Sequence, residues 1–189
     1  MGMNTYTSLK NQFLIAMPNL LDPHFARSVS YILEHNEEGA MGVIINHPLD
    51  INMSDLLEHL EIKTSDDFVG ELPILSGGPV QIERGFILHT PKGNWESSMQ
   101  LSEDIAVTTS KDILEAIANN EGPEHTSVIL GYAGWGAGQL EQEIMENSWL
   151  NVPADSEIIF KTPAEKRWEL ATAKLGIDIS QLSRDAGHA

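Results

Sequence analysis

Apolar residues in this chain occur in short runs that each end at a turn-forming residue, and this pattern restricts the fold more than any other feature. Residues 13–17 are stopped by Pro18, and residues 72–75 lead into Ser76-Gly77-Gly78-Pro79. Short apolar runs bounded by Gly or Pro are typical of buried strands. Between these runs, apolar residues repeat at helical spacing. The sequence therefore predicts strands and helices that alternate along the chain.

A β-hairpin is predicted in the first quarter of the chain. The alternation of Val29, Tyr31 and Leu33 indicates a half-buried strand, residues 36–39 supply a turn, and residues 41–46 return as a second strand. A hairpin requires antiparallel neighbours, whereas the interleaved helices are typical of mixed sheets. We therefore expect one α+β domain with a mixed sheet.

Four helices are expected from amphipathic spacing and start signals. They begin near Asn52 or Ser54, at Ser110, near Gln139 and at Thr162. The last start is the clearest, because Thr162 can serve as N-cap, Pro163 as the first helical residue and Glu165 as the closing residue of a capping box. Residues 158–160 form a continuous apolar run and are predicted as the last strand.

The composition is that of a globular protein. The chain has 189 residues, of which 41% are hydrophobic and 21% charged, so we expect one domain over residues 1–189, with residues 1–10 as a flexible tail. Cysteine is absent. This excludes disulfides, thiolate nucleophiles and cysteine-bound zinc or iron–sulfur clusters.

The charge is strongly and evenly negative. The chain has 28 acidic and 11 basic residues, a net charge of −17, and residues 1–100 hold five of the basic and thirteen of the acidic ones. Because no basic stripe exists to release counterions, direct binding to nucleic acid is not expected. The seven histidines include no pair spaced four residues apart, so no metal or other cofactor is expected either.

Export and membrane signals are not recognised in the sequence. The longest uncharged stretch, residues 126–140, includes four glycines and is shorter than the roughly 20 apolar residues that span a bilayer. Residues 1–21 contain neither a basic cluster nor a small-residue cleavage site. We expect a cytoplasmic protein without membrane contacts.

Two arrangements are candidates for hydrolytic chemistry. Ser76 precedes Gly77 and Gly78, whose backbone N–H groups could hold an oxyanion. The same glycines are equally explained by a turn that needs positive φ. The second candidate is the adjacent pair Glu34 and His35, although neighbouring residues point to different faces of a strand or helix.

A glycine-rich segment is the strongest candidate for ligand binding. Residues 131–138 hold four glycines between a predicted strand and a predicted helix, but match neither the dinucleotide fingerprint nor the P-loop. Tyr132, Trp135 and Gln139 suit a neutral polar ligand or a peptide backbone, while Glu141 would repel phosphate. Alternatively, the glycines only let the aromatic residues pack at the sheet edge. Gly77 and Gly78 are additional binding candidates.

Arg27 is predicted to be a structural cation. It follows the Asp22-Pro23 turn and precedes the strand that starts at Val29, so its stem is expected to lie against the sheet. In a chain with few cations, its guanidinium is expected to be partly buried and paired with carboxylates or carbonyls.

Several segments together resemble the YqgE/AlgH family. They are Phe13-Leu14-Ile15-Ala16-Met17-Pro18, Tyr31-x-x-Glu34-His35, Gly77-Gly78-Pro79-Val80, Leu130-Gly131-Tyr132-Ala133-x-Trp135, Gly138-Gln139-Leu140-Glu141 and Ala186-Gly187-His188-Ala189. The resemblance covers essentially the whole chain. It implies an α+β fold with a complex, bifurcated, mostly antiparallel sheet that includes a barrel-like portion flanked by helices. The family has a transcriptional-regulator label but no established activity or catalytic residues.

We therefore expect a cytoplasmic binding or regulatory protein that is not an enzyme and acts on a protein or small-molecule partner. The alternative is a hydrolase that uses Ser76 or the Glu34–His35 pair. A pocket that brings a base within hydrogen-bond reach of a nucleophile would favour the enzyme, and scattered side chains would favour the binding protein.

Overall fold

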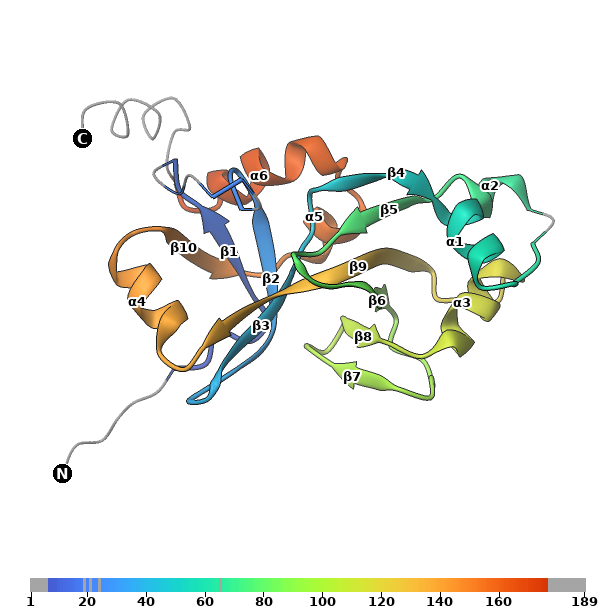
Figure 1. Cartoon of the computed structure of the whole chain (residues 1–189), viewed down its shortest axis with the longest axis horizontal. Helices are drawn as coiled ribbons and strands as arrows, with labels where there is room; N and C mark the ends of the chain where they lie inside the picture. Colours follow the sequence, from blue (N-terminus) through green and yellow to red (C-terminus); the bar gives the residue numbers. More distant parts are fainter. Residues whose placement is uncertain (1–6, 19, 21, 24, 65, 177–189) are drawn as a thin grey trace.

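The computed structural model describes residues 7–18, 20, 22–23, 25–64 and 66–176, which form ten strands and six helices (Figure 1). The strands are β1 (Gln12–Ala16), β2 (Val29–Asn36), β3 (Gly39–Ile44), β4 (Pro48–Asn52), β5 (Pro73–Ser76), β6 (Val80–Thr90), β7 (Ser98–Gln100), β8 (Ala106–Thr108), β9 (His125–Gly136) and β10 (Trp149–Pro153). The helices are α1 (Met53–His59), α2 (Asp67–Gly70), α3 (Lys111–Ala118), α4 (Gln139–Met145), α5 (Ser156–Phe160) and α6 (Ala164–Ala173). Residues 1–6 of the predicted tail and the motif at residues 186–189 lie outside the described residues.

Strand β9 belongs to both halves of the sheet. Residues 133–136 pair with β3, whereas residues 125–130 pair with β6 on one side and residues 128–130 with β5 on the other. The first half continues through β2 and β1 to β10, and the second through β8 to β7, with β4 beside β5. The sheet divides at β9 and curls into a half-barrel flanked by helices (Figure 1), which confirms the expected α+β fold.

The chain crosses β9 between β5 and β6. The backbone N–H of Gly77 donates to the carbonyl of Leu130 over 2.7 Å, and the carbonyl of Gly77 accepts from the N–H of Ile44 over 2.8 Å. At Gly78, with φ of +151°, an added Cβ would lie 2.3 Å from the carbonyl oxygen of Tyr132. The two glycines are therefore required by close backbone packing.

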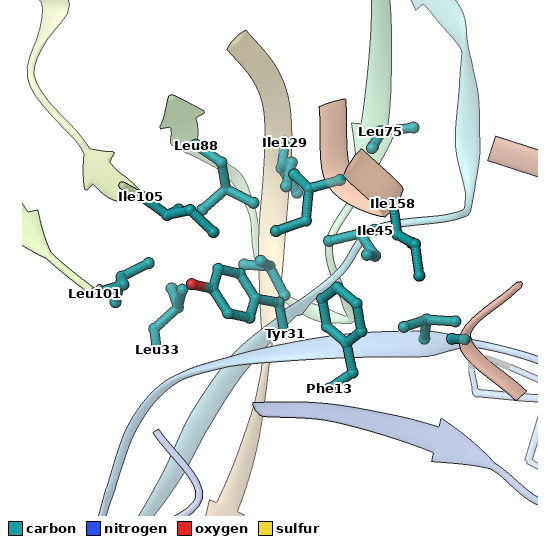
Figure 2. Packing of buried hydrophobic residues seen from close by; sticks show 14 of the residues in the cluster. Phe13, Tyr31, Leu33, Ile45, Leu75, Leu88, Leu101, Ile105, Ile129 and Ile158 are labelled. Atoms are coloured by element: carbon teal, nitrogen blue, oxygen red, sulfur yellow. The ribbon is translucent and has the colours of Figure 1, made fainter. Parts of the chain in front are cut away.

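Three apolar clusters stabilise this arrangement. The largest combines side chains from both halves of the sheet, including Phe13 and Tyr31, whose rings pack edge to face with centroids 5.8 Å apart (Figure 2). A second cluster joins α1 and α3 to the sheet through residues such as Leu57, and a third joins α4 to the sheet through Trp135 and other residues. Full burial of one large apolar side chain, such as Phe13 or Leu57, stabilises the folded state by about 1.5–3 kcal/mol.

Most predicted elements are present. The β2–β3 hairpin is antiparallel, and Asn52 caps α1 in a capping box with Asp55. At α6, the helix starts at Ala164 with Pro163 in the cap position, so the prediction of Thr162 as N-cap is wrong by one residue. The hydroxyl of Thr162 instead donates to the carbonyl of Glu157 over 3.0 Å.

Two segment predictions are wrong. Residues 158–160 belong to α5 and not to a strand, because Asp155 caps a helix there by accepting from the N–H of Glu157 over 2.9 Å. A short apolar run does not distinguish a strand from one buried helical turn. Residues 131–136, which were predicted to connect a strand to a helix, are instead the end of β9, because they pair with β3 and β6. None of the helices in the described ranges is long and apolar enough to cross a bilayer.

Candidate functional site

The segment from Tyr132 to Glu141 uses its polar groups within the fold. Trp135 is buried, and its indole N–H donates to Glu143 Oε1 over 3.3 Å. Gln139 accepts from the N–H of Gly136 and donates to Glu143 Oε2, both over 2.9 Å. Glu143 also accepts from the indole N–H of Trp149 over 3.0 Å. These contacts join α4 to β9 and β10, so the indole N–H of Trp135 and the side-chain amide of Gln139 already have partners in the fold.

The two aromatic candidates are not brought together. Tyr132 is half-buried and packs edge to face on Phe86, with centroids 5.9 Å apart, in the largest cluster. Trp135 packs in the third cluster, against Trp149. Residues three apart on a strand point to opposite faces. The geometry therefore agrees with the alternative in which the glycines serve the packing of the aromatic residues.

Glu141 interacts with a buried histidine. Its Oε1 pairs with Nε2 of His35, whose Nδ1 accepts from the backbone N–H of Leu9 over 2.9 Å. Because Nδ1 is an acceptor, Nε2 carries the proton and donates to the carboxylate. The pair links α4, β2 and the segment before β1.

Some of the groups considered for hydrolysis are used within the fold. The N–H of Gly77 donates to Leu130, and the N–H of Ser76 donates to the carbonyl of His47 over 2.7 Å. Burial lowers the pKa of His47 below its ordinary value of 6.5. Glu34 is exposed while His35 is buried, so the adjacent pair does not converge on one pocket. No group of three His, Asp or Glu side chains within the described residues is arranged to hold a metal.

The prediction that Arg27 is partly buried is wrong. Its side chain is exposed, and its guanidinium lies over the ring of Trp168, 4.6 Å from the centroid. Its backbone has φ of +54°, and its carbonyl accepts from the side-chain amide of Asn46 over 3.0 Å. The chain turns sharply at Arg27, and this turn directs the side chain outward onto α6.

An apolar groove that sequence reasoning missed lies between α1, α3 and β6, and we call it the α1–α3 groove. It encloses about 530 Å³. Its apolar lining residues are Ile51, Leu56, Leu60, Ile82, Ile87, Leu114, Val128 and Leu130. Its polar lining includes Asp55, His59, Glu83, Thr109, Ser110 and Lys111. Figure 1 shows α1 and α3 together at one end of the molecule.

The groove forms because the apolar face of α1 is wider than the part of it that packs in the core. Leu57 is buried in the second cluster, whereas Leu56 and Leu60 are half-buried and line the groove. On the opposite side, the pairing of β6 with β9 is interrupted between Val80 and Gly85. This irregularity leaves Ile82 66% exposed. The wide apolar face of α1 could have indicated a groove from the sequence. Only the structure shows that β6 lies on the opposite side of it.

The divided sheet, the half-barrel and the surface groove define the class of protein as α+β, with a sheet that divides at one shared strand. The AlgH-like family model matches residues 13–180, and the chain belongs to this family. A UPF0301 protein of Thioalkalivibrio sulfidiphilus is 57% identical over 187 residues, covering 99% of this chain and 100% of that protein. A UPF0301 protein of Hahella chejuensis is 56% identical over 189 residues, covering 98% of this chain and 99% of that protein.

A solved structure shows the same fold. The solution structure of the AlgH protein from Pseudomonas aeruginosa matches with a TM-score of 0.80 and 47% identity, and the match covers 100% of both chains. The resemblance to the YqgE/AlgH family is therefore confirmed, and with it the fold that the resemblance implied.

Proposed function

We propose that this protein is a cytoplasmic binding protein that regulates a partner protein by holding one of its amphipathic segments in the α1–α3 groove. The exposed isoleucines at the rim carry this proposal. Ile82 is 66% exposed and Ile51 38% exposed, and Leu49, two residues before Ile51 on β4, is 37% exposed. A small molecule inside the groove would leave this rim in water. A protein segment would cover both the inside of the groove and its rim. Exposed apolar surfaces of this kind usually mark sites of contact with another protein.

Charge favours a basic partner segment. Asp55 and Glu83 stand at the groove, Lys111 is the cation of its lining, and the whole chain has a net charge of −17. A segment with apolar side chains at helical spacing and flanking Lys or Arg residues would match both the apolar floor and the surrounding potential. Such complementarity mainly speeds the encounter of the two proteins.

The test uses peptides displayed on phage and selected on the folded protein. We expect the selected peptides to carry leucine or phenylalanine at helical spacing together with Lys or Arg. Ile82→Gln should weaken their binding by about tenfold or more, because it removes apolar surface from the rim without adding a charge that would attract a basic peptide. Since Ile82 is largely exposed, this variant should fold as the wild type does.

Met145→Gln is the matched control. Met145 is 78% exposed on α4, so the change is again from an exposed apolar residue to a neutral amide, but outside the groove. The control should bind the peptides with wild-type affinity. Equal weakening by both variants, or selected peptides without apolar residues, would refute the proposal.

A further inference from the structure

A second cleft, of about 360 Å³, lies where the β4–β5 pair and β9 meet α5 and α6. We call it the Arg167 cleft, and the elements around it can be followed in Figure 1. Leu75, Val128 and Ile159 are among the apolar side chains that form most of its wall. Its volume is at the small end of the range of about 300–1,000 Å³ for ligand pockets.

The charge of this cleft is opposite to that of the molecule. Lys161 and Arg167 line it, and none of its described lining residues is an aspartate or a glutamate. The chain as a whole has 28 acidic and only 11 basic residues. Two cations without a carboxylate therefore make this a locally positive and largely apolar site on an acidic protein.

Arg167 is held in place by neutral groups. Its Nε donates to the carbonyl of Thr162 over 2.9 Å, and its Nη1 donates to the carbonyl of Ile45. These two bonds use two of the five N–H donors of a guanidinium. No carboxylate of the described residues lies within salt-bridge distance of Arg167.

The guanidinium is poorly solvated in this position. Burial lowers the pKa of Arg167, while the nearby charge of Glu165 opposes this shift. Glu165 is itself exposed and does not line the cleft. Arg167 is half-buried, and a half-buried cation without an opposite charge in contact is less favourable than one in water, so a bound anion would relieve part of this cost.

We propose that the Arg167 cleft binds a small organic carboxylate that carries an apolar chain or ring. The planar guanidinium can pair with a carboxylate, and Lys161 adds a second positive charge at the cleft. The hydroxyls of Thr126 and Ser127 are further polar groups of the lining. The apolar wall would contact the apolar chain or ring of the ligand. Inorganic phosphate has no such apolar part. This cleft shares only Val128 with the described lining of the α1–α3 groove, and the proposal does not depend on the function proposed for that groove.

The probe pair is hexanoate and hexanamide, which have the same chain and differ in charge. Titrations followed by two-dimensional amide NMR spectra should show hexanoate shifting the signals of Ser127 and Lys161. Hexanamide should bind about tenfold more weakly, because it lacks the charge that Arg167 and Lys161 attract. Inorganic phosphate should also bind more weakly than hexanoate, because it makes no apolar contact.

Lys161→Gln tests the site without removing the bonds of Arg167 to the backbone. We expect it to weaken hexanoate binding by about threefold or more, whereas Lys166→Gln should leave the affinity unchanged. Lys166 is exposed on α6 and outside the lining, so it controls for the same change in net charge. Several results would overturn the proposal. They are equal affinities for hexanoate and hexanamide, phosphate binding as tight as hexanoate, equal effects of the two variants, and no shifts in the cleft up to about 10 mM hexanoate.

Discussion

The carbonyl oxygen of Gly78 lies 2.7 Å from the point at which Gly131 would carry a Cβ atom. At this point the segment from β5 to β6 crosses β9 backbone against backbone, and Gly131 has φ of +81°. The crossing is where β9 changes from pairing with β5 to pairing with β3. The absence of a side chain at Gly131 therefore leaves the space through which the crossing segment passes between the two halves of the sheet.

We expect Gly131→Ala to lower the free energy of unfolding by about 2–4 kcal/mol, because the methyl group meets backbone in addition to the strain of positive φ. Urea denaturation measures this loss. The control is Gly176→Ala, where φ is +71° and no atom of the described residues lies within 4 Å of the added Cβ. The control should cost only about 1 kcal/mol. Equal losses would show that the crossing tolerates a methyl group.

Glu143 should be important for stability. It accepts hydrogen bonds from both Trp135 and Trp149, and Trp149 is almost fully buried. Glu143→Ala should destabilise the protein by about 2–4 kcal/mol, because the indole donors lose their shared acceptor. Thermal unfolding followed by tryptophan fluorescence would measure the loss. Glu146→Ala, at an exposed position of the same region, should change stability by less than about 0.5 kcal/mol.

His89 should make stability depend on pH. It is fully buried, with Nδ1 donating to the carbonyl of Pro91 over 3.0 Å and Nε2 accepting from the hydroxyl of Thr108 over 2.7 Å. Burial lowers the pKa of His89 below its ordinary value of 6.5, although the bond to Pro91 opposes this shift. The unfolded chain therefore binds the proton more tightly, and stability present above pH 6.5 is lost as the pH falls below it.

His89→Gln should reduce this loss between about pH 7.5 and 5.5, as measured by urea midpoints. Some dependence on pH should remain, because burial also lowers the pKa of His47. His59→Gln, at an exposed position at the end of α1, is the control for the replacement of a histidine by glutamine. A His89→Gln profile identical to that of the wild type would contradict the prediction.

Arg27 should contribute little to stability. Its exposed guanidinium stacks on Trp168, and such cation–π contacts contribute about 0.5–1 kcal/mol. We expect Arg27→Met to lower the free energy of unfolding by about this amount. A loss of about 3 kcal/mol or more would instead indicate that Arg27 neutralises a buried carboxylate.

Duplex DNA should not bind this protein specifically at physiological salt. With a net charge of −17, the chain has no basic stripe that could release counterions from a phosphate backbone. Fluorescence anisotropy at about 150 mM salt should show no sub-micromolar affinity for any duplex. Tight binding that weakens as salt is added would contradict this prediction. It would show that the fold brings basic residues that are distant in the sequence together on one surface.

Local features of the fold could be predicted from the sequence, because they depend on neighbouring residues. The alternation that starts at Val29 predicted the β2–β3 hairpin, and the capping residue Asn52 predicted the start of α1. The apolar run at residues 158–160 was misread because burial there comes from distant packing and not from strand pairing. The family resemblance supplied the divided sheet, which no local pattern indicates.

By itself the sequence determined an acidic α+β protein without thiol chemistry, because composition, periodicity and capping are properties of short segments. Only the tertiary structure decided which of its residues are available for binding. Trp135 and Gln139 looked suited to a ligand, but their partners on α4 and β9 already satisfy them. Neither Ile82 nor Arg167 was predicted from the sequence to bind a ligand, yet each lines a cleft whose other walls come from distant segments. A cavity is formed by residues far apart in the chain, so its shape and charge follow from packing and desolvation and not from local pattern.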